Sequence, residues 1–174
     1  MIETVGENRR SGTRSKLCAT STGRYNRGAM TAQTAPSSVK DPAAEAVEIV
    51  ETYLRLHMIP DPDAARAYCA PELEIRFTGN RLMRDPADAT AFNKSRYKWV
   101  KKKFGPTHVV AGGTPEETVV YQTGTLYGEW PDGTPFEGNR YVDRYVVRHG
   151  KIVKMEVWND SAEWLLIRAG LVKP

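Results

Sequence analysis

Cysteine is scarce in this chain of 174 residues, which contains only Cys18 and Cys69. Two cysteines do not make the disulfide framework that is typical of small secreted proteins, so the sequence favours a reduced, cytoplasmic setting. Long apolar runs are lacking as well. No stretch approaches the roughly 18 apolar residues in a row that indicate a membrane-spanning helix, and we therefore expect no membrane partner.

Familiar metal and cofactor motifs are also missing. The three histidines, His57, His108 and His149, do not have the spacing of metal ligands. The sequence has no glycine-rich nucleotide-binding motif, no phosphate-binding loop and no G-x-S-x-G nucleophile turn. We therefore predict a protein that uses no metal ion and no cofactor.

Positive charge is concentrated in one segment. Residues 1–40 hold seven of the 25 Lys and Arg residues but only two of the 21 Asp and Glu residues, so the net charge of +4 belongs to this segment. The rest of the chain lacks the clustered basic face of a nucleic-acid-binding domain. Residues 1–38 are rich in Ser, Thr, Gly and Arg, and we predict a disordered basic tail followed by one domain at 39–174.

Three helices are expected in the first part of this domain. Asp41 is a suitable N-cap because Pro42 follows it at the first helical position. The helices are predicted to run from Asp41 to Pro60, from Asp63 to Cys69 and from Asp85 to Gly105. In the third helix Lys101–Lys103 is interpreted as a solvated end. Its apolar positions are Phe92, Trp99, Val100 and Phe104.

Strands are expected in the second part, where apolar and polar residues alternate with a period of two. The predicted strands are 73–77, 107–111, 117–129, 134–148 and 151–158, with a closing helix at 163–169. Turns are predicted at Pro131-Asp132-Gly133 and at His149-Gly150. This order predicts an α+β fold, a curved antiparallel sheet with the N-terminal helices packed on its concave face.

The stretch 134–160 is the most informative part of the sequence. Asp143 shares a strand face with Tyr141 and Tyr145, where a buried carboxylate is costly unless it has a partner. Together with the element order, the segment GKIVKMEVWND after a tyrosine-rich strand resembles the SnoaL-like, or nuclear transport factor 2-like, superfamily. The resemblance covers 43–169 and implies a small cone with a pocket that often hosts acid–base chemistry. The ending WNDSAEWLLIRAGL is similar to phenazine-biosynthesis A/B-type proteins.

Ketosteroid isomerase is the sharpest comparison within that superfamily, because a helix Tyr and a protonated strand Asp there stabilise a developing oxyanion. VETYLRLHMIPD and YVDRYVVRHGKI resemble the segments that carry this pair, which implies catalytic roles for Tyr53 and Asp143. The position of that family's general base falls at Phe77, so a proton acceptor is missing. His57 lies one helical turn after Tyr53 and could move the proton instead.

Further residues are expected to line the pocket or to face away from it. Gln122 should lie opposite Asp143 across the hairpin. The other predicted substrate-binding residues are Tyr141, Tyr145, Phe77, Val157, Asn159 and Phe92. Glu156 should point out of the cone, and so should Trp158 and Tyr121, whose exposed aromatic face favours a homodimer through the outer side of the sheet.

Three functions follow from these residues. The first is a cofactor-independent isomerase or cyclase that acts on a small, mostly apolar carbonyl compound, with Tyr53 and Asp143 stabilising an enolate. The second is a dehydratase in the same fold, in which Tyr141 or Tyr145 orients the leaving hydroxyl. The third is a non-catalytic domain for small-molecule binding or dimerisation, which the missing general base supports.

Overall fold

The structure is a computed structural model that describes residues 41–173. The predicted tail at 1–38 and the first residues of the predicted domain lie outside the described residues. The helices are α1 (Pro42–Met58), α2 (Pro62–Arg66), α3 (Pro86–Arg96) and α4 (Ser161–Arg168). No helix within 41–173 is long and apolar enough to cross a membrane.

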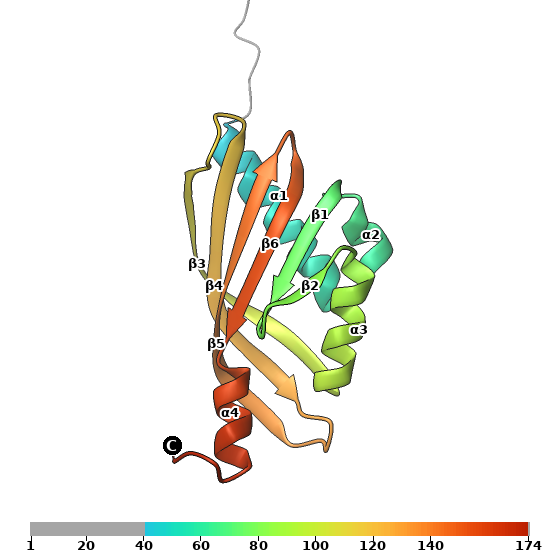
Figure 1. The fold of residues 1–174 in the computed structure, drawn as a ribbon, viewed down its shortest axis with the longest axis vertical. Helices are drawn as coiled ribbons and strands as arrows, with labels where there is room; N and C mark the ends of the chain where they lie inside the picture. The colour runs from blue at the N-terminus through green and yellow to red at the C-terminus, as the bar shows by residue number, and fades with distance from the viewer. Residues whose placement is uncertain (1–40, 174) are drawn as a thin grey trace, which may run out of the picture. The chain divides into compact units, whose positions relative to one another are not determined.

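Six strands form one curved sheet in the order β2-β1-β6-β5-β4-β3 (Figure 1). They are β1 (Cys69–Phe77), β2 (Arg81–Met83), β3 (Trp99–Ala111), β4 (Glu117–Glu129), β5 (Pro135–Arg148) and β6 (Lys151–Asn159). The predicted α+β cone is confirmed. One pair departs from the antiparallel prediction, because β1 and β6 run parallel while every other neighbouring pair is antiparallel.

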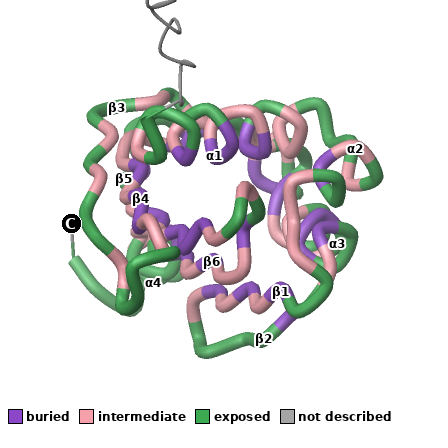
Figure 2. Tube along the Cα trace, turned by 90° about the horizontal axis from the view of Figure 1, so that it is seen from above, coloured by how far each residue is buried: buried purple, intermediate pink, exposed green. Residues whose placement is uncertain are grey.

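Helix α1 supplies one wall of the interior. Asp41 caps it as predicted, accepting a hydrogen bond from the backbone N–H of Ala43 at 3.1 Å. Its buried residues face the inner side of β4, β5 and β6, and the view along the long axis shows α1 and β6 on opposite sides of the interior (Figure 2). The members of this face are Ala46, Ile49, Val50, Tyr53 and Leu54.

The third predicted helix is wrong beyond Arg96. Tyr97 already has extended backbone angles (φ −130°, ψ 146°), and residues 99–111 form strand β3. Gly105 and Pro106 do not end a helix, because they lie at an irregularity within the β3–β4 pairing. Along β3 exposure alternates, so Lys101 and Lys103 are exposed while Lys102 points inward. The predicted solvated helix end is therefore a strand with one partly buried, inward-facing lysine.

The C-terminal hairpins agree with the predictions. His149 and Gly150 both have positive φ (49° and 70°), as a two-residue hairpin turn requires. Gln122 pairs with Asp143 across β4 and β5, which confirms the predicted register. Strand β2 was not predicted, and α2 is shorter than expected because β1 already begins at Cys69.

Candidate active site

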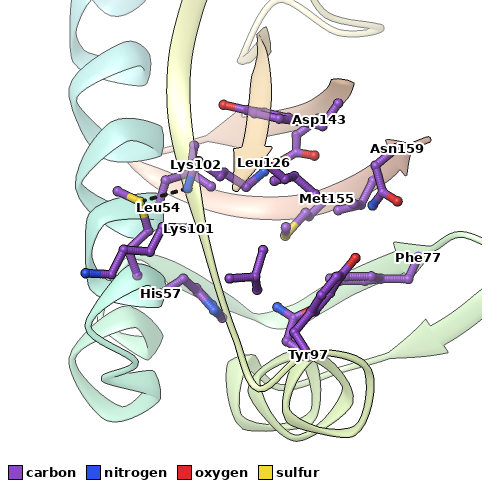
Figure 3. Close-up of a pocket in the computed structure, with 16 residues that line it drawn as sticks. Leu54, His57, Phe77, Tyr97, Lys101, Lys102, Leu126, Asp143, Met155 and Asn159 are labelled. Carbon is purple, nitrogen blue, oxygen red and sulfur yellow. Dashed lines mark hydrogen bonds and ion pairs between the residues drawn. The ribbon is translucent and has the colours of Figure 1, made fainter. Parts of the chain in front are cut away.

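A cavity of about 70 Å³ lies between α1, α3 and the inner face of the sheet. It shares lining residues, among them His57 and Tyr97, with a neighbouring vestibule of about 440 Å³, so the two spaces adjoin each other. Figure 3 shows side chains from helices and strands meeting around the cavity. Its apolar lining residues are Leu54, Met58, Phe77, Ala89, Val100, Leu126, Met155 and Val157.

Asp143 is the one carboxylate among the lining residues of this cavity. It is completely buried, and its Oδ2 accepts hydrogen bonds from Lys102 Nζ and, at 3.1 Å, from the Tyr145 hydroxyl. Its Oδ1 is buried and has no hydrogen-bond partner among the described residues. A buried oxygen without a partner is costly, so Oδ1 retains an unused capacity to accept a hydrogen bond or a proton.

Lys102 was not predicted as a site residue, and it changes the chemistry of Asp143. Its side chain is 17% exposed, and its Nζ forms an ion pair with Asp143. The same Nζ lies 3.7 Å from the centroid of the Tyr141 ring, a cation–π contact. The alternation of Val100, Lys102 and Phe104 would have placed this lysine inside had the segment been interpreted as a strand.

Burial shifts the two members of this pair in opposite directions. It raises the pKa of Asp143 above its usual range, although Lys102 opposes the shift. It also lowers the pKa of Lys102, which Asp143 opposes. The pKa values of the two groups are therefore closer together than in water. Transfer of a proton from the Lys102 ammonium to the Asp143 carboxylate consequently requires less free energy than in water.

His57 lines both the cavity and the vestibule. Its Nε2 is buried and has no hydrogen-bond partner among the described residues, and its ring packs 4.6 Å from that of Tyr53. Burial, and to a smaller degree the charge of Lys102, lowers the pKa of His57 from 6.5 to about 4. The imidazole is therefore neutral at pH 7 and available as a hydrogen-bonding group.

This low pKa predicts a pH-dependent stability. As the pH falls, His57 is protonated in the unfolded chain before it is protonated in the folded protein. The contribution of neutral His57 to the free energy of unfolding is therefore fully present above about pH 6.5 and is lost as the pH falls toward 4. Between pH 7 and pH 5 the loss in free energy of unfolding should be about 2 kcal/mol. Urea unfolding at both pH values should show a smaller loss in His57→Leu, whereas the exposed control His108→Gln should behave as the wild type. Equal losses in all three proteins would contradict the expectation.

Tyr53 is fully buried next to the cavity but is not among its lining residues. Its hydroxyl donates to Met155 Sδ at 3.6 Å, and its ring meets that of Tyr145 edge to face at 6.1 Å. Burial raises the pKa of Tyr53 well above its ordinary value of 10. Tyr53 and Asp143 were predicted to donate together to a substrate oxygen, but the Tyr53 hydroxyl is directed at Met155, and Lys102 is the hydrogen-bond partner of Asp143.

Three further predicted residues form a layer around the ion pair. The Tyr141 hydroxyl donates to Gln122 Oε1, and Gln122 Nε2 donates to the Gly105 carbonyl at 3.4 Å. Tyr141 lines the cavity, while Gln122 and Tyr145 lie behind the lining residues. Gln122 therefore holds the tyrosine ring against which the ammonium group of Lys102 packs.

The remaining predicted residues are divided between the cavity and its surroundings. Phe77, Val157 and Asn159 line the cavity. Phe92 lies behind Phe77, edge to face at 5.2 Å between ring centroids. Asn159 Oδ1 accepts from the backbone N–H of Ser161 at 3.1 Å, so its side chain is oriented by the start of α4. The lining residues that the sequence did not reveal include Tyr97, Leu126 and Met155.

The outer face of the sheet carries the residues predicted to point away. Glu156 binds Arg144 at 2.6 Å, which confirms that its carboxylate does not enter the cavity. Trp158 is 47% exposed, and Tyr121 is partly exposed. A homodimer through this face stays a prediction. Within residues 41–173 no group of three or more potential ligands is arranged to hold a metal ion.

No protein-family model and no curated protein matches the sequence, but many solved structures match the fold. An NTF2-like protein of unknown function from Burkholderia pseudomallei is 17% identical with a TM-score of 0.56, over 75% of this chain and 98% of that one. A candidate SnoaL-like polyketide cyclase from Jannaschia sp. is 18% identical with a TM-score of 0.57, over 79% of this chain and all of that one.

A third similar structure is the CaMKII hub of S. rosetta, which is 19% identical with a TM-score of 0.55, over 69% of this chain and 98% of that one. The domain therefore has the nuclear transport factor 2-like, or SnoaL-like, fold. The structures that share this fold include a candidate polyketide cyclase and the CaMKII hub, so function must be argued from the pocket of this chain.

Proposed function

We propose that the protein is a cofactor-independent enzyme of the isomerase or cyclase type, which removes a proton next to the carbonyl group of a small, mostly apolar compound. The observation that carries the proposal is the ion pair of the partly buried Lys102 with the fully buried Asp143 at an otherwise largely apolar cavity. Perturbed ionisable groups in a pocket are typical of catalytic sites. The candidate polyketide cyclase among similar structures supports the same class.

In this proposal Asp143 is the proton acceptor. Its free Oδ1 takes the proton from the carbon next to the carbonyl, and the raised pKa of the carboxyl makes the protonated product less unfavourable. This assignment supplies the general base that is absent at Phe77. It also reverses the role expected from the sequence, in which Asp143 was a neutral hydrogen-bond donor.

Lys102 provides the positive charge. As proton removal proceeds, negative charge develops on the carbonyl oxygen, and an ammonium group next to Asp143 stabilises it in a site of low dielectric. The Tyr141 ring keeps the ammonium group in place. Neutral His57 offers Nε2 to a further polar group of the substrate.

The proposal is tested by following deuterium incorporation from D₂O into a panel of methyl ketones, aryl ketones and cyclic enones by NMR. The wild type should exchange the protons next to the carbonyl well above the buffer rate, and a planar phenol should inhibit because its phenolate resembles the enolate. No exchange with any member would contradict the proposal and favour a binding domain. Loss of water from an added β-hydroxy ketone would instead assign a dehydratase.

A pair of matched variants decides whether the cavity is the site. Val157 lines the cavity and Val142 lies on the outer face of the neighbouring strand. Val157→Phe should block exchange because it fills the cavity, whereas Val142→Phe should leave the rate unchanged. Because overpacking costs about 1–3 kcal/mol, thermal melting should verify that both variants remain folded.

A further inference from the structure

We propose that the amine of Lys102 condenses with the carbonyl group of an aldehyde or unhindered methyl ketone to form an imine in the cavity. This inference rests on the proposed function and deepens it, because it names the substrate class and makes the polarisation of the carbonyl covalent. The substrates would be reactive carbonyl compounds with an apolar remainder, rather than hindered cyclic enones held by charge alone.

The position of Lys102 carries the proposal. Its Nζ lies at the cavity beside a carboxylate and against an aromatic ring, and its side chain is 17% exposed. By contrast, the side chains of Lys98 and Lys103 are 60% and 57% exposed and pair with surface glutamates. An amine with restricted access to water is the type that favours an imine, because hydrolysis of the imine requires water.

The partner of Lys102 supplies the acid–base chemistry that condensation requires. Transfer of one proton from the ammonium group to Asp143 along their hydrogen bond gives a neutral amine and a carboxylic acid. Burial favours this uncharged pair, since it lowers the pKa of Lys102 and raises that of Asp143. The nucleophile and the acid are then in direct contact.

Condensation of the Lys102 amine with the carbonyl group requires no further reactant. The nitrogen lone pair forms a bond to the carbonyl carbon, the C=O π bond breaks, and the oxygen receives the proton of Asp143. The carbinolamine then loses its hydroxyl as water, taking a proton from the nitrogen by way of Asp143. The resulting protonated imine withdraws electrons from the adjacent carbon, whose proton passes to Asp143 to leave an enamine.

Reductive trapping tests the proposal directly. The full chain is incubated with benzylacetone and sodium cyanoborohydride at pH 7, and adducts are mapped by peptide mass spectrometry. We expect a mass increase equal to the ketone less one oxygen atom, predominantly on Lys102 itself, assigned by fragment ions that separate it from the adjacent Lys101 and Lys103. Acetylacetone should independently produce the absorbance of an enaminone. Labelling of Lys98, Lys103 and other exposed lysines to the same extent as Lys102 would overturn the proposal.

Two variants separate this inference from the proposed function. Lys102→Arg keeps the positive charge beside Asp143 but cannot form an imine, and Lys103→Met is a control on the same strand. We expect Lys102→Arg to lose trapping and at least roughly 100-fold of the exchange rate for methyl ketones, while Lys103→Met behaves as the wild type. If Lys102→Arg retains exchange and the wild type is not trapped, the imine is excluded while the proposed function stands. Trapping without exchange in the wild type would leave the imine in place and remove the proposed function.

Discussion

Replacing Asp143 by Asn is expected to lower the rate of deuterium exchange next to a ketone by roughly 100- to 10,000-fold, the usual contribution of a general base. The amide keeps the size of the side chain but does not accept a proton at neutral pH. Oδ1, which is buried and has no hydrogen-bond partner within residues 41–173, is the atom whose chemistry is lost. The measurement is exchange in D₂O by NMR, with protein folding followed by circular dichroism.

Glu156→Gln is the matched control for this variant. It makes the same change of carboxylate to amide on the neighbouring strand, but Glu156 faces outward and binds Arg144. We expect its exchange rate to remain within about twofold of the wild type, as is usual for a group outside the site. Asp143→Glu adds a second test, because it keeps the charge but displaces the oxygens and should still lose about 100-fold. Unchanged rates in both Asp143 variants would remove Asp143 from the mechanism.

Replacing both members of the ion pair should separate stability from function. Lys102→Met leaves Asp143 buried without a counter-charge, and Asp143→Leu does the same to Lys102. Each single change should lower the free energy of unfolding by about 3–5 kcal/mol. The double variant Lys102→Met/Asp143→Leu should recover most of this loss, because two apolar side chains of similar volume need no counter-charge.

Urea unfolding of the wild type, both single variants and the double variant measures this coupling. The double variant should be more stable than either single variant and should show no exchange and no imine trapping. If the double variant loses as much free energy of unfolding as the two single variants together, the two residues do not interact. That result would contradict the proposal that Lys102 and Asp143 act as a pair. Stability without activity would instead mean that the pair is retained for chemistry rather than for the fold.

The local sequence pattern was sufficient to predict several strand faces, turns and helix starts of this protein. The period-two alternation of 134–160 placed Asp143, Tyr141 and Tyr145 on one inward face, and His149-Gly150 supplied the turn that pairs Arg148 with Lys151. Asp41 identified the start of α1. Each of these features depends on residues that are close in the sequence, where strand period, turn chemistry and helix capping act directly. The pairing of Asp143 with Val157 depends in addition on a register shift between Val146 and Val147, which the sequence did not reveal.

The partner of Asp143 was decided only by tertiary structure. Lys102 is 41 positions away in the sequence, on a segment whose apolar residues fit a helix as well as a strand. Pairing of β3 with β4 removed that ambiguity and turned Lys102 toward the cavity. In the same way, Tyr53 was assigned to the correct helix, but its hydroxyl meets Met155. A sequence pattern determines which face a side chain takes, whereas the group that it meets there depends on how distant strands and helices pack.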